Sequence, residues 1–182
     1  MYVISDRGEL VTRYDERLLS NTKLSFMYTP GSGPVTFEVG GLRFGCAMGI
    51  EVHFPEVFAE YARLDVDGVL ISTGPGQSPD GTAAFAVEAQ AHAATNGLWV
   101  SFAMSAQHSD AGPAGIIAPD GRWAERCPGN AHPAVAIADI DNGPESIGVA
   151  VAKARPWRPL ARAAAYDDHL VADDRRDDRG AS

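Results

Sequence analysis

The residues from Phe44 to Glu56, FGCAMGIEVHFPE, form the segment whose pattern best suits chemistry. Its first part alternates like a strand, and Phe54-Pro55-Glu56 opens a helical repeat, so the chain must turn tightly between the two. Such a turn exposes the residue at the strand's end and aims backbone N–H groups at a bound oxyanion. Nucleophiles are commonly placed in this way. The pattern therefore predicts a candidate site at this turn.

The flanking segments predict strands and helices that position this turn. The chain starts as a strand that turns at Asp6-Arg7-Gly8 and continues through Tyr14. Periodicity and turn residues predict a hairpin of 35–39 and 42–48, a helix over 54–64, a strand over 69–71, an alanine-rich helix ending near 96–97, a strand over 98–104, a hairpin of 115–118 and 122–124, a strand over 134–140 and a helix over 145–153. Strands alternating with helices in this order predict an α/β layered fold.

Composition limits the classes of function. The chain has 182 residues, of which 45% are hydrophobic and 21% charged, which fits one globular domain. A net charge of −9 argues against a nucleic-acid partner and against an anionic membrane surface. No apolar run approaches the roughly 20 residues of a spanning helix, and the start lacks a signal-peptide pattern. We therefore expect a cytoplasmic protein with no membrane partner.

The segment around the turn resembles the signature of the nitrilase superfamily of carbon–nitrogen hydrolases. In that signature a strand ends in Cys, followed by an aromatic or apolar residue, Asp or Glu, two further residues and Phe-Pro-Glu. Counting back from the Phe-Pro-Glu at 54–56, Glu51 takes the acidic position and Ile50 follows the nucleophile. Gly49 then stands at the cysteine.

Further motifs extend the resemblance over residues 1–153. Gly8 with residues 13–18 resembles the strand leading into Tyr-x-Lys, and 28–31 resembles the loop that follows. Residues 64–71 resemble the strand after the elbow helix, and 112–121 resemble a late hairpin with Ala114 at its serine. The resemblance implies a partial α-β-β-α sandwich that lacks the opening strands and helices. Residues 154–182, with their shifted composition, are expected to form an extended arm and a charged tail.

The resemblance also implies a Glu–Lys–Cys triad, of which no member is intact here. Gly49 has no side chain, Glu16 falls at the lysine, and the family's glutamate lies in the opening elements. A carboxylate at position 16 would repel a developing oxyanion. We expect an acidic pocket near Glu16, Gly49, the Ile50 N–H and Glu51. The supporting acid at Glu51 is expected to hold the elbow by hydrogen bonds.

Other candidates for chemistry are weaker. Cys46 lies three residues before Gly49, and this odd offset points it to the opposite face of the strand, where burial should raise the pKa of its thiol. Neither Cys46 nor Cys127 suggests zinc or a disulfide. Metal and cofactor sites are not expected, even at the group formed by Glu51, His53 and Glu56. The remaining residues considered are His92, Trp99, Trp123 and Trp157, expected in packing, and His108 with Asp110, which could line a pocket.

Three hypotheses follow. The first is a catalytically degenerate family member, a pseudoenzyme of hydrolase ancestry that still holds a small amide, amine or nitrile. The second is an active hydrolase of C–N bonds other than peptide bonds, which uses a non-standard nucleophile or residues from upstream. The third is a non-catalytic interaction subunit, because uncovered sheet edges and apolar faces would need a homo-oligomer or a partner chain.

Overall fold

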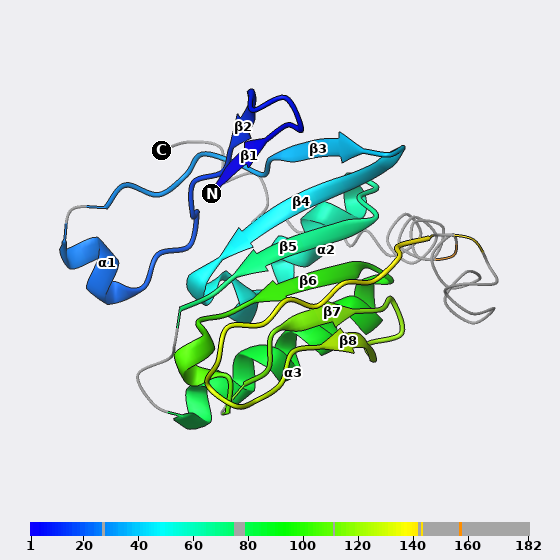
Figure 1. Cartoon of the computed structure of the whole chain (residues 1–182). Coiled ribbons are helices and arrows are strands. Elements are labelled where there is room, and N and C mark those ends of the chain that lie inside the picture. The colour runs from blue at the N-terminus through cyan, green and yellow to red at the C-terminus, as the bar shows by residue number, and fades with distance from the viewer. Residues whose placement is uncertain (27, 75–78, 111, 142, 144–156, 158–182) are drawn as a thin grey trace, which may run out of the picture.

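The computed structural model describes all residues except 27, 75–78, 111, 142, 144–156 and 158–182. It shows an α/β fold in which helices cover one face of a six-stranded sheet, with a smaller two-stranded sheet beside it (Figure 1). The fold class expected from the sequence is therefore confirmed. The expected helix over 145–153 and nearly all of the arm over 154–182 lie outside the described residues.

The large sheet carries its strands in chain order. They are β3 (Thr36–Val39), β4 (Leu42–Met48), β5 (Gly68–Ser72), β6 (Trp99–Ala103), β7 (Gly115–Ile117) and β8 (Trp123–Arg126). The central strands β4, β5 and β6 run parallel, and the outer pairs are antiparallel. Parallel neighbours require crossover connections, and the helices supply them. Both predicted hairpins, on either side of the parallel strands, are confirmed.

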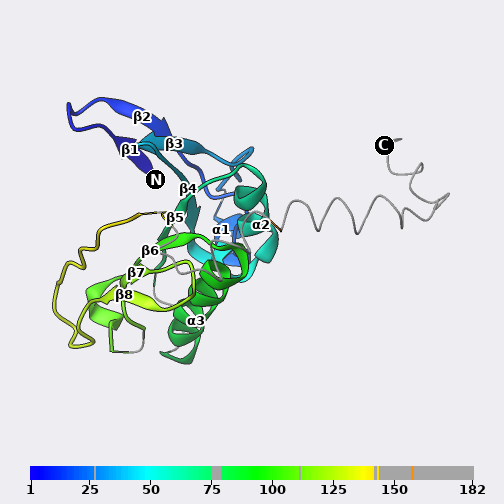
Figure 2. The ribbon, with the colours of Figure 1, turned by 90° about the vertical axis from the view of Figure 1, so that its right-hand side faces the viewer.

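Helices α2 (Pro55–Arg63) and α3 (Pro79–Asn96) pack on the same face of this sheet, as the turned view shows (Figure 2). In α2 the helical spacing of Val57, Phe58 and Tyr61 points all three inward, and all are buried. They meet strand residues such as Val69 and Phe102 in one core cluster. Burying a large apolar side chain contributes about 1.5–3 kcal/mol. This core fixes the end of β4.

The N-terminal part lies at the side of the sheet. Strands β1 (Tyr2–Ile4) and β2 (Leu10–Arg13) form the small antiparallel sheet. The short helix α1 (Asn21–Ser25) follows, with the Ser20 side chain accepting a hydrogen bond from the backbone of its first turn. None of the α1 residues is buried. Figure 1 shows α1 set apart from the two core helices.

The predicted strand over 134–140 is wrong. These residues form no strand, and the side chains of Val135 and Ile137 are 84% and 81% exposed. The alternating pattern suits a strand, but a strand also needs a neighbour for its backbone hydrogen bonds, and β8 is the last strand of the described sheet. Instead, 134–136 lie near β6 and β7 and border a small cavity. In the described part of the chain, no helix has the length and apolarity needed to cross a membrane.

Candidate functional site

The predicted elbow is present at the end of β4. A short 3-10 helix, η1 (Gly49–His53), begins directly after the strand, and α2 follows with Pro55 at its first position. Gly49 has φ +57°, a left-handed conformation that side chains disfavour by roughly 1–2 kcal/mol. An ideal Cβ added at Gly49 would overlap Glu16 Oε1 and lie 3.1 Å from Lys23 Nζ. The space of a nucleophile's side chain is therefore filled by two charged groups.

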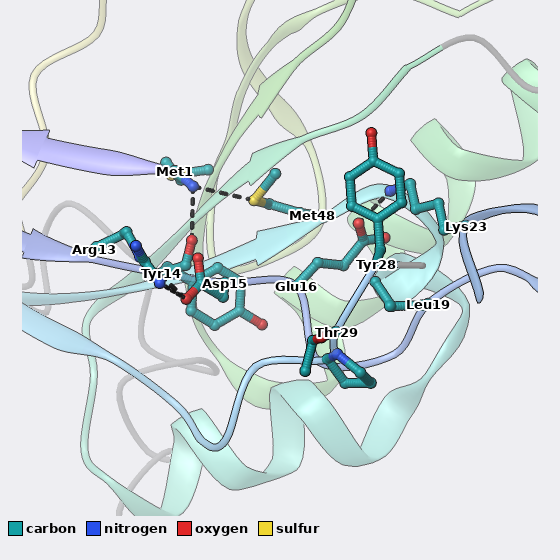
Figure 3. A pocket seen from close by; sticks show the side chains of 11 residues that line it. Met1, Arg13, Tyr14, Asp15, Glu16, Leu19, Lys23, Tyr28, Thr29 and Met48 are labelled. Atoms are coloured by element: carbon teal, nitrogen blue, oxygen red, sulfur yellow. Dashed lines mark hydrogen bonds and ion pairs between the residues drawn. The ribbon is translucent and has the colours of Figure 1, made fainter. Parts of the chain in front are cut away.

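These two groups form an ion pair, drawn in Figure 3, between Lys23 Nζ and Glu16 Oε2. Glu16 is only 8% exposed, whereas the Lys23 side chain is 38% exposed. Glu16 Oε1 is buried and accepts no hydrogen bond within the described structure. The carboxylate at the elbow is therefore only half satisfied.

Lys23 was missed by the sequence analysis. It lies on α1, seven residues beyond Glu16, and belongs to none of the motifs that carry the resemblance. The only local signal is the helix start at Ser20, which predicts a short helix but not the direction of a lysine side chain.

A cavity of about 510 Å³ opens beside this ion pair. Figure 3 shows the side chains around it, among them the Tyr28 ring and the Glu16–Lys23 pair. A second ion pair, Arg13 to Asp15 at 2.5 Å, lies on the same cavity. The lining residues are Met1, Arg13, Tyr14, Asp15, Glu16, Leu19, Lys23, Tyr28, Thr29, Pro30 and Met48.

The expected acidic pocket is corrected in two respects. The cavity wall includes Glu16 but not Gly49, Ile50 or Glu51, which lie behind it in the elbow. Its charges are mixed, since Lys23 and Arg13 accompany the two carboxylates. The motif contains only the acids, and the compensating lysine comes from a segment outside the motif.

Glu51 lies on the inner side of the elbow and is completely buried. Its carboxylate accepts hydrogen bonds from the Tyr14 hydroxyl at 2.7 and 2.8 Å, and from the backbone N–H groups of Arg17 at 2.6 Å and Met48 at 2.7 Å. A longer bond of 3.3 Å comes from the N–H of Leu18. These donors tie the segment after β2 to the end of β4, so Glu51 holds Glu16 and the elbow in register.

Arg17 and Tyr14 complete this buried network. Arg17 pairs with Glu60 of α2 at 2.5 Å, and its Nε donates to the Tyr14 hydroxyl at 3.3 Å. Burial works to lower the pKa of Arg17, but the hydrogen bonds to Glu60 and Tyr14 outweigh it, so the pKa is raised. Burial raises the pKa of Tyr14. Both groups therefore keep their ordinary protonation state and serve as fixed donors.

Cys46 is fully buried within β4. Burial raises the pKa of its thiol from 9.0 to about 11, as expected. Its carbonyl oxygen accepts a hydrogen bond from the Tyr61 hydroxyl at 2.6 Å, which anchors the strand to α2. Cys46 does not line the cavity.

The remaining candidates do not gather into a site. His53 Nδ1 lies 2.6 Å from Glu88 Oε2, away from the buried Glu51, and Glu56 is exposed. His92 stacks on Phe58, and its Nε2 lies 2.7 Å from the Val52 carbonyl oxygen. Neither His108 nor Asp110 lines the cavity beside the elbow; Trp99 is buried, Trp123 packs against the core, and Trp157 is 62% exposed.

The comparisons with known proteins agree with this architecture. The family model for carbon-nitrogen hydrolases matches residues 1–145, so the chain belongs to the carbon–nitrogen hydrolase family. It therefore falls within the nitrilase superfamily that the elbow motif resembles. No curated protein is a significant match to the chain.

Solved structures with the same fold share little sequence with this chain. Glutamine-dependent NAD+ synthetase from Acinetobacter baumannii has 16% identity and a TM-score of 0.61, over 70% of this chain and 25% of that one. An amidase from Nesterenkonia sp. AN1, with covalent addition of the acetamide moiety of fluoroacetamide at its active site cysteine, has 19% identity and a TM-score of 0.58, over 69% and 49%. Nit3 from Saccharomyces cerevisiae, in branch 10 of the nitrilase superfamily, has 18% identity and a TM-score of 0.57, over 66% and 45%. This chain thus spans half or less of their length.

Proposed function

We propose that this chain is a catalytically degenerate member of the carbon–nitrogen hydrolase family, which holds a small amide, amine or nitrile without hydrolysing it. The observation that carries the proposal is the elbow itself. Gly49 supplies no nucleophile, and Glu16 Oε1 occupies the space that a side chain would need.

The chemistry of acyl transfer supports this reading. Removing the nucleophile from a concerted triad costs on the order of 10⁶ in kcat. The carboxylate of Glu16 also opposes the negative charge that develops on a tetrahedral intermediate, and Lys23 is already engaged with that carboxylate. The elbow therefore keeps the shape of the site without its reactive group.

A displaced nucleophile is less well supported. Cys46 is the nearest thiol, but it is buried, its pKa is raised to about 11, and it lies outside the cavity. A thiol attacks as its thiolate, and burial in apolar surroundings suppresses that form.

Labelling with fluoroacetamide tests the absence of a nucleophile at the elbow. The test compares the chain with its elbow unchanged and a control variant with a restored thiol. Both proteins carry Cys127→Ser, because Cys127 is partly exposed and could react without being part of a site. The unmodified elbow should gain no acetamide group by intact-mass measurement. Acetamide addition that maps to Cys46 would contradict the proposal.

The positive control is a charge-swapped variant, Gly49→Cys with Glu16→Lys and Lys23→Glu. It restores a thiol and a lysine while keeping an ion pair of reversed polarity, whereas Glu16→Lys alone would set two ammonium groups against each other. We expect labelling at position 49 in this variant. A variant with Glu16→Lys and Lys23→Glu but without Gly49→Cys should not be labelled there. Labelling at position 49 would show that the elbow still accepts the amide reagent.

A second role, as an interaction subunit, is favoured by one observation. In the small sheet of β1 and β2, the exposed fractions of Tyr2, Ile4 and Leu10 are 65%, 55% and 59%. A sheet of two strands has little stability by itself, and exposed apolar side chains favour contact with another surface. We propose that this sheet contacts a second copy of the chain or a partner chain. Sedimentation velocity of the chain and of Ile4→Lys should show an assembly that the substitution weakens; a compact monomer at every concentration would contradict this role.

The surroundings of the protein follow from its chemistry. The net charge of −9 favours neither nucleic acid nor an anionic membrane as a partner. Cys46 and Cys127 are both free thiols, which fits a reducing compartment, and we propose the cytoplasm.

A further inference from the structure

The unsatisfied oxygen of Glu16 indicates what a ligand must supply. A buried acceptor without a donor costs about 1–3 kcal/mol, and more when it is charged. Glu16 Oε1 is such an acceptor, on a residue that is 92% buried and lines the cavity. Oε1 faces Gly49 at the back of the cavity wall, and because the terminal torsion of a glutamate is soft, a turn of the carboxylate can bring this oxygen toward the cavity. The missing partner is therefore an N–H or O–H donor.

Lys23 supplies the opposite character at the same place. An ammonium group has three N–H donors, and the described structure gives Lys23 Nζ one partner, Glu16. Its side chain is 38% exposed and lines the cavity, so its remaining donors can reach a bound molecule. The Arg13 guanidinium, 57% exposed and on the same cavity, is a second cationic group and is paired there with the Asp15 carboxylate.

A ligand with a single charge would satisfy only one side of this arrangement. A simple amine would meet Glu16 but place a cation beside Lys23, and a simple carboxylate would meet Lys23 but face the Glu16 oxygen. We propose that the cavity binds a small zwitterion, an amino acid with a primary ammonium on Glu16 and a carboxylate on Lys23. This inference rests on the proposed function and narrows its ligand to an amine that also carries a carboxylate.

The dimensions of the cavity fit this class of molecule. A volume of about 510 Å³ falls within the range of small-molecule pockets, roughly 300–1,000 Å³. It exceeds what an amino acid of a few carbons needs, and the Tyr28 and Leu19 side chains supply apolar wall beside the charges. A series of amino acids of increasing chain length can therefore find the separation between ammonium and carboxylate that fits the cavity best.

Isothermal titration calorimetry of the full chain tests the proposal. The probes are unbranched ω-amino acids from glycine to 6-aminohexanoate, with butylamine, butyrate and butyramide as four-carbon comparisons for 4-aminobutyrate. At least one zwitterion should bind saturably. Its affinity should exceed that of its matched amine and acid by about tenfold to a hundredfold, the worth of one hydrogen bond to a charged group.

Two substitutions separate the two charges. Glu16→Gln should remove most of the advantage that the ammonium gives, so the zwitterion binds like the acid. Lys23→Gln should remove the advantage of the carboxylate, so the zwitterion binds like the amine. The matched control is Glu38→Gln, which neutralises an exposed carboxylate paired with Arg43 on β3–β4, away from the cavity, and should leave affinity unchanged.

Three results would overturn the proposal. The first is that no zwitterion of the series binds with a Kd below about 10 mM, and the second is that butyramide binds as tightly as 4-aminobutyrate. The third is that the affinity for the zwitterion is unchanged in both Glu16→Gln and Lys23→Gln. Thermal unfolding of each variant identifies any that fail to fold. If Glu16→Gln does not fold, Lys23→Gln decides the test, because Lys23 is partly exposed and its substitution should leave the fold intact. None of these results bears on hydrolysis. Ammonia release from butyramide would instead contradict the proposed function.

Discussion

Two carboxylates stand on opposite sides of the same elbow, and their surroundings differ. Glu51 is wholly buried and accepts hydrogen bonds from a tyrosine hydroxyl and from backbone N–H groups of two chain segments. Glu16 is almost as buried, yet one of its oxygens has no donor in the described structure. A satisfied buried carboxylate stabilises a fold, whereas an unsatisfied one beside a cavity is available to a ligand. Glu51 therefore has a structural role on the inner side of the elbow, and Glu16 marks the outer side, where we propose that a ligand binds.

Glu51→Ala should have the largest effect, because it tests the inner side directly. The Tyr14 hydroxyl and the N–H groups of Arg17 and Met48 would lose their acceptor, at about 1–3 kcal/mol each. We expect the free energy of unfolding in urea to fall by at least about 3 kcal/mol. A loss below 1 kcal/mol would break the comparison, because Glu51 would then be no more structural than an exposed acid.

The thiol of Cys46 should react slowly in the native state. With its pKa raised from 9.0 to about 11, the thiolate fraction at pH 8 falls about a hundredfold, and burial slows access further. In a Cys127→Ser background, a disulfide reagent should therefore modify the native chain at least about a hundredfold more slowly than the denatured chain. Comparable rates would show that the Cys46 thiol is accessible in the folded chain.

The same shift sets a pH dependence. A thiol whose pKa is higher in the folded protein gives stability that is fully present below pH 9 and is lost as the pH rises through about 11. Comparing the chain with Cys46→Ala by urea unfolding at pH 8, 9.5 and 11 isolates this contribution. The gap between the two proteins should narrow at alkaline pH, and a constant or widening gap would contradict the raised pKa.

Gly49→Ala should have an intermediate effect. The positive φ costs roughly 1–2 kcal/mol for a residue with a Cβ, and the added methyl would push Glu16 away from the elbow. We expect about 1–3 kcal/mol of lost stability in the same urea measurement. The double variant Gly49→Ala with Glu16→Ala should recover the steric part, and the absence of any recovery would show that the two residues do not meet.

Glu16→Gln should have the smallest effect on stability. It removes the charge of the buried member of an ion pair, and because the Lys23 side chain is 38% exposed, water can solvate the ammonium that is left without its partner. We expect a loss of about 0.5–1.5 kcal/mol, the net contribution of one hydrogen bond. The replacement amide can also donate or accept where Oε1 has no partner. A loss as large as that of Glu51→Ala would place Glu16 among the structural residues and remove the contrast on which the binding site rests.

Much of the fold followed from periodicity and turn residues. The helical spacing of Val57, Phe58 and Tyr61 and the stop at Asn96 were sufficient to place the core helices. The elbow followed from a motif that fixes both a turn and a buried acid. Residues 134–140 show the limit of such patterns, because alternation does not reveal whether a neighbouring strand exists.

The site was less accessible to sequence reasoning than the fold. Gly49 and Glu16 were found because they replace motif residues, but their consequence depends on Lys23. That lysine comes from a helix of five residues with none buried, so no amphipathic period predicts where its side chain points. The pairing of charges from different segments depends on tertiary structure, so it could not be predicted from a single sequence.

The most direct test of the central claim is ammonia release from a panel of amides, carbamoyl amines and nitriles. The unmodified chain should release none above the background of a Cys46→Ala, Cys127→Ala variant. The charge-swapped variant with Gly49→Cys, Glu16→Lys and Lys23→Glu restores two of the three triad groups, and ammonia released by it above that background would show that the elbow still accepts an amide or a nitrile. Release by the unmodified chain that Cys46→Ala abolishes would contradict the account and establish a working nucleophile within β4.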